Sequence, residues 1–199
     1  LWRRWIERSA PMLVISGMVV VLLRLDLFAV AIFLGHREAG IYAAALAIVT
    51  LLSQVLRAAN SVVMPEIAPL YLARKMRSLQ NLANVQAILS FWPLLILTSG
   101  TILFGKELLR LWHPDFAEAY PALVILAFSM LIRASNGNPG YFLLMCGKSQ
   151  KLVRIYLVIL AVDVVALLVL VPLLGLAGAA LGTCFSLTVS RIYLRTILH

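Results

Sequence analysis

The sequence predicts an all-α membrane protein with six transmembrane helices, and its composition is the first observation that supports this fold class. Of the 199 residues, 63% are hydrophobic and only 13% are charged, and the mean hydropathy is +1.00. A soluble domain normally has about a quarter charged residues and at most about half apolar ones. No water-soluble packing could hide so much apolar surface.

The second observation is the division of the chain into six long apolar stretches. A helix needs roughly 20 apolar residues to cross a hydrocarbon core about 30 Å thick. We expect such spans at residues 11–34, 41–65, 83–104, 119–146, 153–172 and 176–198. The connections are short and rich in Gly, Pro and basic residues, and no soluble domain fits between them. Residues 1–199 are therefore expected to form a single six-helix transmembrane lobe.

The distribution of Lys and Arg predicts the orientation of these spans. With both ends of the segment in the cytoplasm, eleven basic residues lie in the inside connections, against three outside, namely Arg37, Lys106 and Arg110. Cytoplasmic loops of membrane proteins carry such an excess. The inside set is Arg3, Arg4, Arg8, Arg74, Lys75, Arg77, Lys148, Lys151, Arg154, Arg191 and Arg195. Because the chain opens at Leu1 with no signal peptide, we also expect a missing part to precede it.

Several classes of function are excluded by the same composition and motifs. The net charge is +9, but the basic residues separate hydrophobic blocks and do not form the clustered solvated face that binds nucleic acid. Cys146 and Cys184 lie inside apolar runs, and the three histidines have no metal-ligand spacing. The sequence contains no nucleophile paired with a base, no phosphate-binding glycine loop and no HExxH motif. We expect no enzyme, no cofactor, no metal site and no nucleic-acid partner.

Polar residues inside the predicted spans are the candidates for function. A charge in hydrocarbon costs at least about 2.5–3.5 kcal/mol, so such residues by default mark a pathway or a site. The second span carries a polar stripe at three- and four-residue steps, which places it on one face of the helix. The fourth span carries a similar stripe and a sequence that should interrupt the helix, Asn136 to Gly140. The candidates for lining a cavity are Arg24, Gln54, Arg57, Asn60, Arg133 and Asn136.

Each candidate has a structural alternative. Arg57 either lines the cavity or extends its side chain to the cytoplasmic interface, which lies only about 10 Å of helix away. Arg24 and Arg133 either hold a substrate or form ion pairs with Asp26 or Asp163. The two aspartates are the candidates for ion coupling, and Asp163 can equally be a buried ion-pair partner or a neutral carboxyl group. Gly178, Gly182 and Ser186 on the sixth span favour helix packing over ligand binding.

The chain also resembles a known family over nearly its whole length. The sequence from Phe33 to Ala45, the segment from Ala59 to Ala68 with its proline, Met145 to Lys148, and the turn from Pro172 to Ala180 are similar to the C-terminal half of polysaccharide-type flippases. These belong to the multidrug/oligosaccharidyl-lipid/polysaccharide exporter superfamily. The order, spacing and topology of these strings carry the resemblance, because each string alone is degenerate.

The resemblance implies one lobe of a two-lobe transporter whose central cavity alternates its access across the membrane. The substrate would be an undecaprenyl-pyrophosphate-linked oligosaccharide, moved outward across the bacterial cytoplasmic (inner) membrane for O-antigen, capsule or exopolysaccharide assembly. The partners would be this lipid-linked substrate, the membrane lipids and a missing N-terminal six-helix lobe. Lipid II flippases of the family bind a cation through the helices that correspond to those of Asp26 and Asp163, but Ile159 stands here in place of an amide.

Three readings of function follow. In the first, the three intramembrane arginines attract a lipid pyrophosphate, because the guanidinium fork matches phosphate oxygens. The second is a drug or metabolite exporter of the same superfamily, for which we expect an acidic or aromatic cavity; three arginines against two aspartates favour the first reading. The third is a membrane scaffold that transports nothing, which would leave the polar stripes unexplained.

Overall fold

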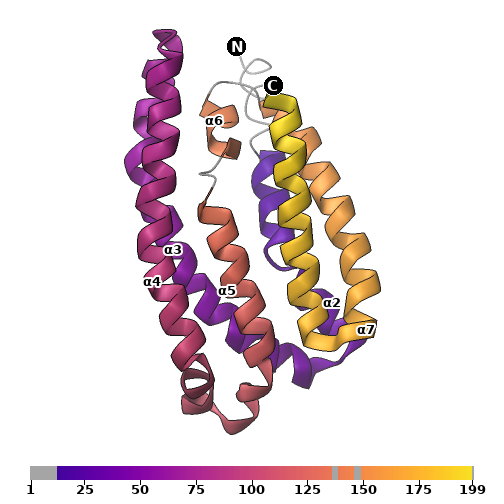
Figure 1. Cartoon of the computed structure of the whole chain (residues 1–199). Coiled ribbons are helices and arrows are strands. Elements are labelled where there is room, and N and C mark those ends of the chain that lie inside the picture. Colours follow the sequence, from indigo (N-terminus) through magenta and orange to yellow (C-terminus); the bar gives the residue numbers. More distant parts are fainter. Residues whose placement is uncertain (1–12, 136–138, 146–148, 199) are drawn as a thin grey trace.

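The computed structural model describes residues 13–135, 139–145 and 149–198, and nearly all of them are helical (Figure 1). The elements are a first helical segment (Leu13–Leu22), α2 (Leu25–Phe33), α3 (His36–Leu72), α4 (Met76–Trp112), the short 3-10 helix η1 (Pro114–Ala119), α5 (Tyr120–Ala134), α6 (Pro139–Met145) and α7 (Ser149–Leu198). No β-strand occurs in the described ranges. The predicted all-α class is therefore confirmed for them.

Within the described residues, four helical stretches are long and apolar enough to cross a membrane. They are His36–Leu72, Met76–Trp112, Pro114–Ala134 and Leu152–Val189. The first segment and α2 add a fifth if the two together form one span, which is bent by 41° between them. This pattern indicates a multi-pass membrane protein.

The last of these stretches reverses direction in its middle. Gly175 has φ 59° and ψ −136°, a conformation open to glycine and costly for other residues. Figure 1 shows the consequence: the orange limb of α7 before Gly175 and the yellow limb after it run antiparallel, side by side. The turn that the sequence predicts between the last two spans is therefore present.

The helices pack around one large core, and a second, smaller cluster joins the first segment, α6 and the start of α7. The hairpin of α3 and α4 packs on α5, while α2 packs on both α3 and α7, and α5 joins the two groups by packing on α7. The fully buried side chains at the centre include Tyr42, Leu94, Leu123, Leu126 and Val171. Large apolar side chains also cover the outer surface, including Trp92, Ile96, Leu103 and Phe104 on α4, as expected for helices that face lipid.

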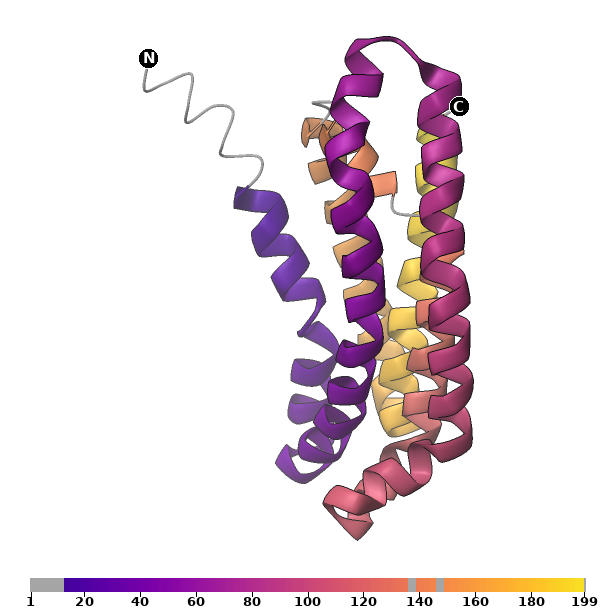
Figure 2. The ribbon, with the colours of Figure 1, turned by 90° about the vertical axis from the view of Figure 1, so that its left-hand side faces the viewer.

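The connections alternate between the two ends of the bundle. The α2–α3 connection, the segment between α4 and α5 and the reversal within α7 lie at the lower end in Figure 1, and the α3–α4 turn lies at the upper end. Figure 2 shows α3 and α4 side by side, joined by that turn, while the segment Leu13–Leu22 diverges from α3. The connections expected outside and inside the cell thus fall at opposite ends of the bundle.

The helix ends differ from those expected. The span expected to end at Pro65 continues to Leu72, although Pro65 and Pro69 both lie inside α3. The span expected at 83 is already helical at Met76, and it continues past residue 104 to Trp112. Hydrophobicity marks only the part of a helix that faces hydrocarbon, whereas the backbone hydrogen bonds continue into the polar ends. A proline loses one of these bonds but need not end a membrane helix.

Candidate functional site

The polar stripe on α3 is exposed in the middle of an apolar helix. Thr50, Gln54, Arg57 and Ser61 are exposed, and Ser53 is half-buried. The hydroxyl groups of Thr50, Ser53 and Ser61 donate hydrogen bonds to backbone carbonyls of their own helix. Gln54 and Arg57 therefore present the most polar groups of this surface. An uncovered polar face on a span requires water, a substrate or another part of a protein against it.

The Arg57 side chain turns toward the preceding turn of its own helix. Its Nη2 donates to Ser53 Oγ at 3.1 Å. Side chains on a helix incline toward its N-terminus, and the N-terminal half of α3 leads away from the end expected in the cytoplasm. The guanidinium therefore points away from the end of α3 that connects to α4.

Asn60 occupies a different place from the one expected. It is buried, and its Oδ1 accepts a hydrogen bond from Gln86 Nε2 on α4. The side chain therefore joins α3 to α4 and is not part of the exposed stripe. Asn60 follows Arg57 by three residues, which corresponds to a rotation of about 300° around the helix. It therefore falls about 60° to one side of Arg57, at the edge of the stripe.

The other two arginines lie where helices end. Arg24 is exposed at the break between the first segment and α2, in the middle of the span expected at 11–34. Arg133 is half-buried in the last turn of α5, where a cation also interacts favourably with the helix dipole. α5 ends at Ala134 and α6 begins at Pro139. Asn136 and most of the expected interruption lie outside the described residues.

Asp26 and Asp163 are both buried and lie near enough to affect each other, which nothing in the sequence indicates. Asp26 is 4% exposed and Asp163 is 2% exposed, and the two carboxyl groups are close enough to interact electrostatically. Asp26 Oδ2 accepts a hydrogen bond of 2.9 Å from the Tyr42 hydroxyl, and Oδ1 accepts one of 2.8 Å from the Leu27 N–H. An ion pair with Arg24 or Arg133 was considered for Asp26. In the described part of the chain, its carboxyl group instead accepts hydrogen bonds from two neutral donors.

The surroundings of Asp163 complete this acidic cluster. The Ser186 hydroxyl, on the second limb of α7, lies against the Asp163 carboxyl group, and Thr183 lies against Tyr42. Asp163 Oδ1 is buried without a hydrogen-bond partner in the described residues. The cluster therefore joins α2, α3 and both limbs of α7 around one incompletely satisfied carboxyl group. Buried groups of this kind are expensive and are commonly functional.

Sequence reasoning missed several of these polar residues. Tyr42 was missed because nothing in the sequence connects it to a carboxylate 16 positions earlier. The buried polar stripe on α4 could have been found from its spacing, since its members are four, eight and three residues apart and so share one face of the helix: Gln86, Ser90, Thr98 and Thr101. In the described ranges, Gln86 Oε1 and Thr98 Oγ1 are buried without hydrogen-bond partners.

Comparisons of the chain with protein-family models, curated proteins and solved structures found no match. The resemblance to flippases therefore depends on the sequence strings alone. Within the described residues, no group of three or more His, Cys, Asp or Glu side chains could hold a metal ion.

Proposed function

We propose that this chain is a six-span lobe of a membrane transporter that moves a lipid-linked oligosaccharide of the undecaprenyl-pyrophosphate type across the bacterial cytoplasmic membrane. In this proposal the first segment and α2 form one span, α3 and α4 form one each, α5 and α6 form the fourth, and the limbs of α7 form the last two. Both ends of the segment lie in the cytoplasm, in keeping with the distribution of Lys and Arg.

The observation that carries the proposal is the uncovered polar face of α3, with Arg57 near its middle. A face of this kind would be unfavourable against hydrocarbon but suits the wall of a water-filled path. Moving a polar headgroup along such a path spares it the cost of crossing the apolar core. The guanidinium of Arg57 supplies the charge and the paired donors that bind a pyrophosphate.

The acidic cluster supports a role in energy coupling. Two buried carboxylates that interact electrostatically disfavour each other when both are charged, and binding of a proton or a small cation by either would remove that cost. Asp26 and Asp163 lie on different helices, α2 and α7, so loading and unloading of such an ion would change how these helices pack. This is a role that transport against a gradient requires.

The proposal is tested by reconstituting the protein, with any coding sequence that precedes Leu1, into vesicles that contain a fluorescent undecaprenyl-pyrophosphate oligosaccharide. Movement between leaflets is followed by adding a membrane-impermeant quencher. A charge-assisted hydrogen bond contributes about 1.5–3 kcal/mol, so Arg57→Ala should slow movement roughly 10- to 100-fold. Arg57→Lys should recover part of the rate, because lysine keeps the charge without the fork.

Arg77→Ala is the matched control, because it removes the same side chain from the first turn of α4, outside the expected spans. It should move the substrate at the normal rate. Vesicles in which the unaltered protein moves no substrate would contradict the proposal, as would an Arg57→Ala variant with full activity.

A further inference from the structure

A hollow of about 370 Å³ lies where α3 begins and α4 ends. Its lining residues come from the start of α3, the end of α4 and η1: Arg37, Ile41, Trp112, His113, Asp115 and Phe116. The volume falls in the range of about 300–1,000 Å³ that is usual for small-ligand sites. This end of the bundle is the one expected outside the cell.

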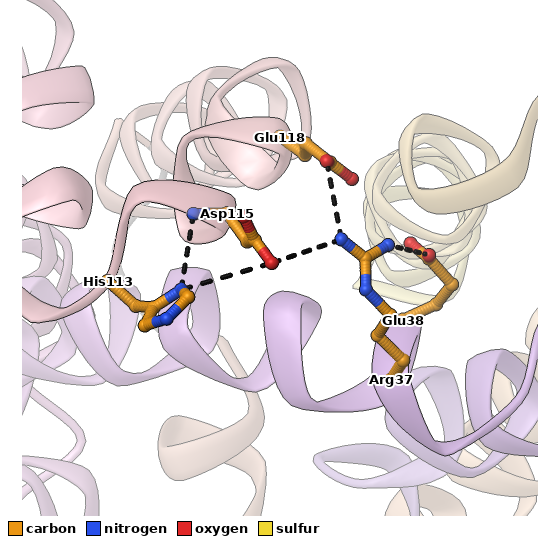
Figure 3. A network of polar contacts seen from close by, with 5 residues as sticks. All are labelled: Arg37, Glu38, His113, Asp115 and Glu118. Carbon is orange, nitrogen blue, oxygen red and sulfur yellow. Dashed lines mark hydrogen bonds and ion pairs between the residues drawn. The ribbon is translucent and has the colours of Figure 1, made fainter.

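The polar wall of the hollow is held in place by ion pairs between two elements. Arg37, on the first turn of α3, contacts Asp115 at 3.2 Å and Glu118 at 3.6 Å, both on η1, and Glu38 at 3.1 Å (Figure 3). Figure 3 shows the guanidinium between the carboxylates, which approach it from opposite sides. A donor group fixed in this way loses little freedom when it binds a ligand.

The His113 ring is also fixed, and its geometry leaves a donor free. His113 Nδ1 accepts a hydrogen bond of 3.3 Å from the Asp115 backbone N–H, and the ring lies 5.8 Å from the Phe116 ring, centre to centre. In a neutral imidazole the nitrogen that accepts carries no hydrogen, so the proton is on Nε2. Nε2–H is therefore available as a donor.

The charge of the lining selects the kind of ligand. Arg37 and Asp115 neutralise each other within the lining, and Glu38 and Glu118 add negative charge behind them. A phosphate or carboxylate ligand would be repelled by this surplus, while Arg37 opposes an organic cation. A neutral ligand with both donors and acceptors fits best.

The remaining wall is aromatic. Trp112 is 55% exposed at the end of α4, and Phe116 lines the same hollow. The ring of a neutral sugar has one apolar face of C–H groups that packs on an aromatic surface, and hydroxyl groups around its edge that both donate and accept. Tryptophan offers a large apolar surface together with one N–H donor.

We propose that this hollow is a subsite for a neutral sugar unit, which packs on Trp112 and forms hydrogen bonds with Arg37, Asp115 and His113. The proposal rests on the proposed function, because the sugar would be part of the oligosaccharide as it reaches the outer face. A subsite there would hold the glycan away from the membrane path and so oppose its return.

The test uses the full chain in lipid nanodiscs with Trp112 as the only tryptophan, after Trp2, Trp5 and Trp92 have been replaced by Phe. Methyl β-glucoside, methyl β-galactoside and N-acetylglucosamine are the neutral probes, and choline and glucose 1-phosphate are the charged probes. We expect a saturable change in tryptophan emission with at least one neutral probe. Arg37→Ala should weaken that binding at least tenfold, whereas Arg110→Ala, which removes an exposed arginine paired with Glu107 on the same helix, should leave it unchanged.

Other outcomes would overturn the inference. These are the absence of a saturable response to every neutral probe, a response to choline or glucose 1-phosphate that is at least as strong, and equal binding by the Arg37→Ala and Arg110→Ala variants. The vesicle assay separates the two proposals. Transport without sugar binding would remove only the subsite, and sugar binding without transport would leave a sugar-binding membrane protein that is not a flippase.

Discussion

The reversal within α7 depends on Gly178, and replacing this residue by alanine should damage the fold. A Cβ built at Gly178 would lie 2.0 Å from the backbone oxygen of Leu170 and 2.6 Å from its carbonyl carbon. Both atoms belong to the opposite limb of the hairpin, and backbone cannot rotate away as a side chain can. The two limbs would have to separate by more than an ångström, and the core contacts of Leu167 and Val171 would open with them.

The expected magnitude follows from two opposing terms. Overpacking of a tight contact costs typically about 1–3 kcal/mol, and a backbone clash belongs at the upper end of that range. Alanine also gains about 1 kcal/mol over glycine in a helix interior. We therefore expect Gly178→Ala to lower the free energy of unfolding by about 2 kcal/mol.

Gly100→Ala is the matched control, because nothing lies within 4 Å of a Cβ built at Gly100, in the middle of α4. It should be neutral or raise stability by up to about 1 kcal/mol. Unfolding of the purified protein by a denaturing detergent, followed by circular dichroism, would measure both variants. Equal stability of the two variants would refute the close approach of the α7 limbs.

Four further predictions concern topology, Arg24 and the acidic cluster. Single cysteines at His36 and Arg77 should be labelled from outside and from inside the cell respectively, because the basic residues favour that orientation; the reverse pattern would overturn it. Arg24→Ala should impair polysaccharide export while the protein still reaches the membrane, and normal export would exclude a role in binding the substrate. Asp26→Asn removes the charge but keeps the shape, so transport in vesicles should no longer respond to an imposed pH gradient, whereas a normal response would make Asp26 structural. Tyr42→Phe removes one hydrogen bond from the same carboxylate, so transport should respond less strongly to the pH gradient. An unaltered response would contradict this prediction.

The sequence predicted those parts of the fold that depend on local pattern. Apolar length located the helices, and the proline and glycine residues located the reversal at Gly175. These features follow from the backbone preferences of single residues and from the length needed to cross a bilayer. α3 and α4 extend at both ends beyond the spans expected at 41–65 and 83–104. Hydrophobicity marks only the part of a helix that faces hydrocarbon, and the helix itself is longer.

The sequence could predict which polar residues share one face of a helix, but not which residues of different helices contact each other. The stripe containing Gln54 and Arg57 was visible from its spacing, and both residues are exposed on the same helix. Contacts between helices were not visible, because they depend on the rotation of each helix about its axis. For this reason Asn60 was assigned to the wrong surface, and the association of Tyr42 with Asp26 was not foreseen.

The proposed transport path depends on the uncovered polar face of α3, and the exposure of this face to water can be measured directly. Cysteines placed singly at Gln54, Arg57 and Ser61 should react with a membrane-impermeant thiol reagent, because they line a water-filled path. Cysteines at Ile96 and Leu103, which are 70% and 75% exposed on the apolar surface of α4, should not react, because lipid covers them. Equal protection of both sets would show that lipid covers the α3 face too, and would contradict the proposed path.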